Sequence, residues 1–387
     1  MLRLQARLLL RGLRFYAGCW IRAFSPECRQ LAPLGPRRWL VLVIGLPAAL
    51  LLQAVHGLAL LLDELFFPGY RRAPIREPLM ITGLPRSGTT AVHRRLARDR
   101  DRFSTPATWE VLLAPAILEK QIFRVLGALD RVIGRPGGRC LAWLFRRLAG
   151  DFNAIHETGP DAPEEDYLLL LPYGGCFLAV LAFPADPAVW RLAKLDTWPA
   201  AERRLLVDGY LSLLRRHLYV FGRGRRLLSK NAAFASWLPA LRGALPESRW
   251  LVCIRRPDEA LSSQLSAVAG GAAALGVRPR NPGFVDPFSD TFAHALSVLV
   301  EVFEDPQGLA VVDQAVLKND SDGVLAAALC RVGEAPTGPM RKSAESEPPK
   351  THRSGHNHRP GDWNLNAETL QRLTRLHETL TLYSVRP

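Results

Sequence analysis

Residues 78–98 constrain the fold of this chain more than any other stretch. A short apolar run over 78–82 leads into a loop that contains Gly83 and Gly88, and a helical pattern follows over 91–98. Glycines let a backbone curl so that several N–H groups converge, and the helix dipole favours negative charge at the helix N-terminus. A strand, a glycine-containing loop and a helix in this order predict a site for phosphate or a similar anion.

The loop over residues 83–90 has the spacing of a phosphate-binding P-loop, G-x-x-x-x-G-K-[ST], with one departure. Thr89 stands at the position of the lysine that normally reaches the β- and γ-phosphates of a nucleoside triphosphate. Arg86 still supplies a permanent cation inside the loop. The pattern therefore predicts a phosphate-binding loop and argues against an NTPase. The alternative is an ordinary strand–helix turn.

The run Pro-Arg-Ser-Gly-Thr-Thr resembles the 5′-phosphosulfate loop of the sulfotransferases, in the form shared by the bacterial sulfotransferase family and the tyrosylprotein sulfotransferases. The resemblance implies transfer of a sulfuryl group from 3′-phosphoadenosine 5′-phosphosulfate (PAPS) to a hydroxyl. Arg86 would stabilise the charge that develops on the leaving phosphate oxygen. The implied donor-binding residues of the loop are Pro85, Arg86, Ser87, Gly88, Thr89 and Thr90.

PAPS carries two separated anionic groups, so the resemblance implies a second anion site. A strand pattern over 249–254 ends at Arg255, and Ser263 follows on a predicted helix. In sulfotransferases an arginine and a serine at this spacing hold the 3′-phosphate, and arginine suits phosphate through its bidentate fork. The alternative is a solvated arginine and a buried serine. This strand does not end in an aspartate that could hold magnesium, so we expect no metal.

Transfer to a hydroxyl also needs a general base. Glu110 is the predicted base, because the similar enzymes carry an acid in the segment after the loop helix. The alternative is an acid that only caps the start of a helix. His156 and the pair Glu164–Glu165 are further candidates to line the acceptor pocket.

A segment near the C-terminus resembles the loop that closes over the nucleotide in cytosolic sulfotransferases. It contains Arg353-Ser-Gly and, after a longer gap than in those enzymes, Gly361-Asp-Trp. Arg353 is therefore a candidate phosphate ligand, although Ser354 replaces the lysine of that motif.

Strand and helix patterns alternate downstream of the loop. Strands are predicted over 226–230, 249–254 and 308–312, helices over 111–126, 235–245, 257–267, 291–303 and 323–332, and a Gly/Pro-rich loop over 270–287. This order predicts an α/β fold, with a P-loop-like parallel sheet flanked by helices and sites at the carboxyl ends of the strands. We assign residues 77–387 to a catalytic domain and residues 1–76 to N-terminal membrane-associated helices.

The first helical pattern carries a basic stripe. On a helical wheel an arc of about 100° contains Arg3, Arg7, Arg11, Arg14 and Arg22. A basic stripe against apolar residues is typical of a membrane-surface helix. The alternatives are a presequence and a solvated face of a helix packed on the domain.

Residues 39–62 contain no charged side chain. As a helix they would extend ~36 Å and match the ~30 Å hydrocarbon core of a bilayer. Gln53, His56 and the Gly45–Pro47 break fit a half-inserted helix equally well. PAPS is made in the bacterial cytosol and the composition looks bacterial, so we expect insertion without crossing and a cytoplasmic catalytic domain. The alternative is a single-pass membrane protein.

The net charge of +14 predicts anionic partners. Six of the 50 basic residues are lysines, and aromatic and basic residues are not interleaved, so we do not expect nucleic acid. The six cysteines lack metal-ligand spacing and do not suggest a disulfide framework. The expected partners are PAPS, a membrane surface and a hydroxyl-bearing small molecule, glycan or lipid.

Three functions fit the pattern to different degrees. A PAPS-dependent sulfotransferase accounts for Arg86, Arg255 and Ser263 together. A P-loop kinase or NTPase would need a lysine at position 89 and a magnesium-binding aspartate. A non-catalytic membrane protein with a degenerate nucleotide fold is the third possibility. Membrane proximity favours a lipidic or amphiphilic acceptor.

Overall fold

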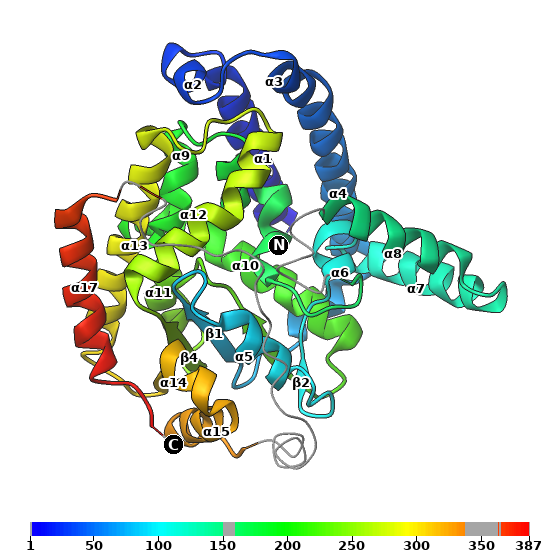
Figure 1. The fold of residues 1–387 in the computed structure, drawn as a ribbon. Coiled ribbons are helices and arrows are strands. Elements are labelled where there is room, and N and C mark those ends of the chain that lie inside the picture. The colour runs from blue at the N-terminus through cyan, green and yellow to red at the C-terminus, as the bar shows by residue number, and fades with distance from the viewer. Residues whose placement is uncertain (1, 150–158, 337–362, 364, 387) are drawn as a thin grey trace.

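A parallel sheet organises the protein. The computed structural model describes residues 2–149, 159–336, 363 and 365–386 (Figure 1). Within them, five strands form one sheet in the order β2-β3-β1-β4-β5, and every pairing is parallel. The strands are β1 (Leu79–Gly83), β2 (Phe103–Ser104), β3 (Arg226–Lys230), β4 (Arg249–Ile254) and β5 (Leu309–Asp313).

Helices cover both faces of this sheet. They include α1 (Leu2–Arg22), α2 (Pro26–Leu31), α3 (Pro36–Leu40), α4 (Leu46–Phe66), α5 (Thr89–Leu96), α6 (Thr108–Leu113), α7 (Ile117–Val132), α8 (Pro136–Ala149), the 3₁₀ helix η4 (Asp166–Tyr173), α9 (Pro187–Trp190), α10 (Ala200–Phe221), α11 (Leu238–Ala244), α12 (Pro257–Ala274), α13 (Pro282–Val302), α14 (Gln314–Asn319), α15 (Ser321–Arg331) and α17 (Ala367–Thr381). Leu79 and Ile81 of β1 share a buried cluster with α5, α14 and α15. Met80, which points to the other face, joins a larger cluster with α10 to α13. The predicted α/β fold with a helix-flanked parallel sheet is confirmed.

Several element boundaries differ from the sequence prediction. The helix expected over 111–126 is two helices, because Pro115 has no N–H to donate and the chain turns between α6 and α7. The loop expected over 270–287 is mostly helical. Helix α12 continues to Ala274, and α13 starts at Pro282 because the Asn281 side chain caps the N–H of Gly283 at 2.9 Å. Strand β2 and helix α17 were not predicted.

The first helix packs against the protein along one side. An added Cβ on Gly12 would lie 2.2 Å from the carbonyl oxygen of Pro172, so α1 and η4 are in close contact. Arg11 Nη1 donates to the Tyr173 carbonyl at 2.5 Å, and burial lowers the pKa of Arg11 to about 10. Arg22 pairs with Asp186 at 3.3 Å. The expected basic stripe is therefore wrong for Arg11, which faces the protein, whereas Arg3, Arg7 and Arg14 are exposed.

Among the described residues, Pro36–Phe66 is one helical stretch long and apolar enough to cross a membrane. The predicted break takes the form of a π-helical turn at Val41–Gly45, after which α4 begins. One side of this stretch is buried: Leu42 and Leu60 are fully covered, and Gly57 lies against Leu9 of α1. The opposite side is exposed.

A buried ionic cluster joins the end of α4 to α10 and to the start of α7. Asp63 accepts hydrogen bonds from Arg216 Nε of α10 at 2.9 Å and from the Ile117 N–H at 2.8 Å. Arg216 Nη2 also donates to Glu64 at 2.8 Å, and all three side chains are almost inaccessible to solvent. Buried contacts thus cross the predicted boundary between residues 76 and 77, which itself stays a prediction.

Candidate active site

The anion loop lies at the centre of the sheet, at the carboxyl end of β1. Gly83 has φ +137°, and an added Cβ would lie 1.9 Å from the carbonyl oxygen of Cys253, so no other residue fits there. Gly88 has φ +88° and precedes α5. Arg86 also has a left-handed φ of +67°, an uncommon conformation for a residue with a side chain. The loop has the backbone form that an anion site requires.

The structure brings the two predicted anion sites together. Arg86 Nε donates to Ser263 Oγ of α12 at 3.1 Å, and Arg255 Nη1 donates to the Arg86 carbonyl at 3.3 Å. Arg255 is also held by Glu259, whose carboxylate accepts from Nε at 3.1 Å and from Nη2 at 2.9 Å. The pKa of Arg86 is lowered by burial and then by the charge of Arg255. The loop and the end of β4 thus form one cationic site.

The remaining predicted loop residues fit an anion site to different degrees. Ser87 is fully buried, and its hydroxyl has no hydrogen-bond partner among the described residues. Thr89, at the first position of α5, is almost fully buried, whereas Pro85 and Thr90 are partly exposed. An unpartnered hydroxyl in the loop would gain an acceptor from a phosphate or sulfate oxygen, so the residues present fit the 5′-phosphosulfate group.

Lys230 belongs to the same edge of the sheet and was not predicted as a site residue. It ends β3, is paired in register with Ile81 of β1, and forms an ion pair with Glu165. Together with burial, its charge holds the pKa of His93 on the loop helix well below its ordinary value. Two features of the sequence could have identified Lys230 as a site residue: it ends a predicted strand, and the chain contains few lysines.

Glu110 lies just beyond the end of β2, and it is buried and fully hydrogen-bonded. One carboxylate oxygen lies 2.8 Å from His217 Nδ1 of α10, and the other accepts from the Ala107 N–H at 3.1 Å. His217 Nε2 in turn lies 2.8 Å from Ser104 Oγ. Burial disfavours the Glu110 carboxylate, but the charge and hydrogen bond of His217 and the charge of Lys120 bring its net pKa below the ordinary value. Glu110 is therefore firmly positioned, and its surroundings favour the carboxylate form.

Glu164 and Glu165 lie on the chain that leads into η4, beside Lys230. Glu164 is partly exposed, and burial raises its pKa while the charge of Lys230 opposes the change. A carboxyl group with a raised pKa at the open edge of the site is a second candidate for the base. Of the other predicted residues, His156 and Arg353 lie outside the described residues.

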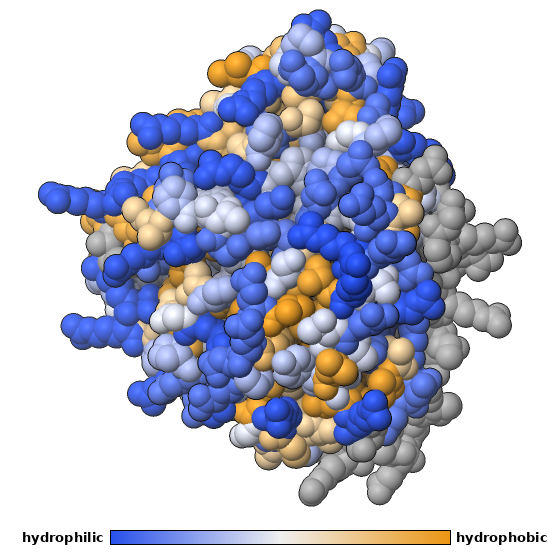
Figure 2. Space-filling model, turned by 90° about the vertical axis from the view of Figure 1, so that its left-hand side faces the viewer, coloured by the Kyte–Doolittle hydropathy of each residue, from blue (hydrophilic) through white to orange (hydrophobic). Residues whose placement is uncertain are grey.

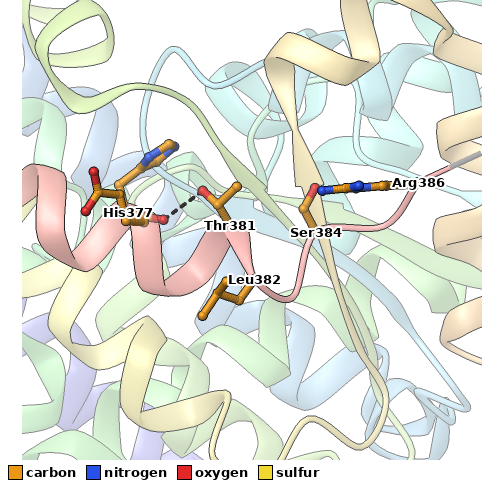
Figure 3. Close-up of a pocket in the computed structure, with 6 residues that line it drawn as sticks. His377, Thr381, Leu382, Ser384 and Arg386 are labelled. Atoms are coloured by element: carbon orange, nitrogen blue, oxygen red, sulfur yellow. Dashed lines mark hydrogen bonds between the residues drawn. The ribbon is translucent and has the colours of Figure 1, made fainter.

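A surface hollow elsewhere is not part of this site. It is lined by His377, Glu378, Thr381, Leu382, Ser384 and Arg386, all from α17 and the chain that follows it (Figure 3). The predicted donor-binding residues that the structure describes come instead from the loop after β1, the end of β4 and helix α12, and the predicted base Glu110 comes from α6. The contacts of Arg86, and not the presence of a hollow, therefore define the candidate active site.

Asp166 is a buried carboxyl group next to the strand end that carries Lys230, and it makes the stability of the protein depend on pH. It accepts hydrogen bonds from the Tyr210 hydroxyl at 2.7 Å and from Asn231, which follows Lys230. Burial raises the pKa of Asp166 to about 6, although these hydrogen bonds oppose the change. Between about pH 4 and pH 6 the folded protein holds a proton that the unfolded chain has lost. The free energy of unfolding therefore falls as pH rises, by up to about 3 kcal/mol from this group.

We expect Asp166→Asn to remove this dependence. Urea unfolding of both proteins at pH 5 and pH 7.5 measures it, and the stability of D166N relative to wild type should rise by about 1 kcal/mol between the two pH values. An equal difference at both pH values would show that Asp166 does not titrate in this window.

Comparison with known proteins agrees with this arrangement. The profile of the Sulfotransferase family matches residues 78–305, more than half of the chain. The chain therefore belongs to the sulfotransferase family, and it is a transferase. Among curated proteins, none matches it.

Two solved structures share the fold. The sulfotransferase STF1 from Mycobacterium tuberculosis H37Rv superposes with a TM-score of 0.70 at 17% identity, over 94% of this chain and 92% of that one. STF9 from Mycobacterium avium superposes with a TM-score of 0.66 at 15% identity, over 98% and 96% of the two chains. Because so little of the chain is left uncovered, most of the N-terminal segment, residues 1–76, belongs to the shared fold.

Proposed function

We propose that this protein transfers a sulfuryl group from PAPS to a hydroxyl of an acceptor molecule. The observation that carries the proposal is the contact of Arg255 with the backbone carbonyl of Arg86, which brings two cationic side chains to the carboxyl edge of the sheet. Arg86 donates to the neutral hydroxyl of Ser263, and no carboxylate pairs with it among the described residues. Arg255 already pairs with Glu259, but Arg86 has a neutral partner only, so an anionic group suits this glycine-bearing loop, and PAPS supplies two such groups.

Each part of the site has a proposed role. The loop over residues 83–90 holds the 5′-phosphosulfate, and Arg255 and Ser263 hold the 3′-phosphate. During transfer the bond between sulfur and the phosphate oxygen breaks while a bond to the acceptor oxygen forms. Negative charge grows on the leaving oxygen, where Arg86 and Lys230 stabilise it. The acceptor proton passes to a carboxylate.

Nucleoside triphosphate chemistry is less well supported. Thr89 is short and almost fully buried at the start of α5, so it cannot do what a P-loop lysine does. Strand β4 leads directly into Arg255, where a magnesium-binding carboxylate would be needed. Fixed arginines without a magnesium ligand at the end of β4 instead favour a sulfuryl donor such as PAPS.

Glu110 remains the proposed base, and a glutamine substitution distinguishes catalysis from support. If Glu110 accepts the proton, Glu110→Gln lowers kcat by about 10²-fold or more, and PAPS affinity stays near wild type. If Glu110 only positions His217 and caps α6, the variant unfolds at lower urea concentration and kcat changes little. Steady-state kinetics and urea unfolding on the same preparation separate the two results.

Glu164→Gln is the matched comparison. It removes a carboxylate from the same edge of the site without touching the hydrogen bonds of Glu110. A large loss of kcat in E164Q together with near wild-type kcat in E110Q would move the base to Glu164.

The acceptor that we propose is lipidic or amphiphilic, and the active site faces the cytoplasm, where bacterial PAPS is made. The test is transfer of radiolabelled sulfate from PAPS into a total lipid extract, in parallel with glycan and small-metabolite extracts. Label in the lipid fraction supports the proposal, and label confined to another fraction contradicts the acceptor class.

The cytoplasmic position of the active site has a separate test. Labelling of exposed Cys330 by an impermeant maleimide in intact cells would contradict that position.

A further inference from the structure

The outer side of α3, of the π-helical turn Val41–Gly45 and of α4 is an exposed apolar surface. Large apolar side chains recur on it at helical spacing and are about half exposed or more: Trp39, Leu40, Val43, Ile44, Leu51, Val55 and Leu58. Leu51 is 68% exposed. Such a continuous apolar face on a single protein marks an interaction site.

The hairpin formed by α7 and α8 carries a second apolar surface. Its helices project from the body beside the lower end of α4, on the same side of the molecule (Figure 1). Exposed apolar residues follow one side of α7 at spacings of three and four: Ile122, Val125, Leu126, Leu129 and Val132, with Ile133 at the tip. Val132 and Ile133 are 84% and 70% exposed. A projecting helix would not keep such a stripe without a partner.

Positive charge surrounds the apolar residues of the hairpin. Residues 121–149 contain six arginines and one aspartate, a net charge of +5. The aspartate, Asp130, is used locally, because its carboxylate accepts from the N–H groups of Gly137 at 2.7 Å and Gly138 at 2.8 Å. Arginines next to exposed apolar side chains match the boundary between anionic headgroups and acyl chains.

We propose that the outer face of α4 and the α7–α8 hairpin together form a docking surface for an anionic lipid bilayer, which the protein contacts without spanning it. A second copy of the chain would place one strongly basic hairpin against another, with no exposed carboxylates on the hairpin to pair with them. Anionic headgroups remove that repulsion. The proposal does not depend on the sulfotransferase reaction.

The interior contacts of α4 explain why this surface docks and does not cross. One side of α4 packs on α1, and its end is held by the buried pairs of Asp63 and Glu64 with Arg216. A spanning helix would have to break these pairs, which would leave buried charges unpaired. The face of the molecule that carries α13 and α17 is mostly hydrophilic, with smaller apolar areas, so the docking surface faces away from it (Figure 2).

Two exposed cysteines allow a matched test on the full-length protein. Cys140 lies on α8 of the hairpin, Cys330 lies on α15, and the other four cysteines are buried. An environment-sensitive dye is attached to Cys140 in Cys330→Ser, and to Cys330 in Cys140→Ser. Vesicles of phosphatidylcholine with about a third phosphatidylglycerol are then added. We expect a blue shift from the dye at Cys140 and no shift from the dye at Cys330.

Substitutions on the apolar stripe complete the test. Val125→Asp with Leu129→Asp should lower the vesicle partition coefficient at least about 10-fold. Leu382→Asp, at a residue 84% exposed beyond α17, should leave the coefficient unchanged. Equal shifts at both cysteines, or wild-type partition of V125D/L129D, would overturn the proposal. So would a dimer in light scattering that V125D/L129D converts to a monomer while neither protein binds vesicles.

Discussion

Replacing Arg86 by methionine is expected to lower kcat/KM for sulfuryl transfer by about 10²- to 10³-fold, the range for loss of a fixed cation at a developing charge. The guanidinium lies in the anion loop beside Arg255 and donates to Ser263 at 3.1 Å. Methionine keeps a long side chain at the same left-handed φ, so backbone strain is comparable in the two proteins. The change in rate then reports the lost charge.

Two companion variants make the result specific. Arg86→Lys keeps the charge but loses the forked geometry, and it should recover part of the rate. Arg98→Ala removes an exposed arginine just after α5, the helix that follows the anion loop. This variant should have wild-type kinetics. If R86M retains kcat/KM within about twofold of wild type, Arg86 does not act on the transferred group.

Replacing Arg216 by methionine is expected to lower the free energy of unfolding by about 3–5 kcal/mol, because the buried Asp63 would lose its ion-pair partner and Glu64 would keep only the partly exposed Arg71. Arg216 is fully buried and bonds to both acids within 3 Å. Urea unfolding measures the loss, and Arg215→Met, at a partly exposed neighbour on α10, is the control.

The origin of this loss is tested by removing all three charges. A variant that combines R216M with Asp63→Leu and Glu64→Met should be more stable than R216M alone, since the buried carboxylates are gone and Arg71, which loses Glu64, is partly exposed to solvent. A stability for R216M within about 1 kcal/mol of wild type would show that the cluster does not join α4 to the catalytic region.

Local sequence patterns predicted the loop because its chemistry is local. Gly83 and Gly88 require unusual φ values, and apolar runs mark strands that are buried on both faces. Arg86 and Ser263 were each predicted as site residues, because both follow strands that the patterns identified, but their contact was not predicted. Motif spacing alone did not show that β1 and β4 are neighbours, which is what places the two groups in contact.

Residues that depend on tertiary packing could not be predicted in this way. Lys230 joins the site because β3 pairs with the other side of β1, an order that no local pattern encodes. Arg11 lies on the expected basic stripe of the first helix, yet its side chain faces the protein because it donates a hydrogen bond to the carbonyl of Tyr173. The buried side of α4 could not be predicted either, because it is determined by contacts with α1, which precedes it, and with α10, which follows much later in the chain.

Calorimetric titration with 3′,5′-ADP, the desulfated donor, tests whether the protein is a PAPS-dependent sulfotransferase. We expect wild-type protein to bind 3′,5′-ADP at least about 10-fold more tightly than ATP with magnesium, because the 3′-phosphate would be held by hydrogen bonds to a charged group. Arg255→Ala should weaken 3′,5′-ADP by about 10- to 100-fold and leave adenosine 5′-phosphosulfate, which lacks the 3′-phosphate, nearly unchanged. Tighter binding of ATP than of 3′,5′-ADP would contradict a PAPS-dependent sulfotransferase. So would an equal loss of affinity for 3′,5′-ADP and for adenosine 5′-phosphosulfate in R255A.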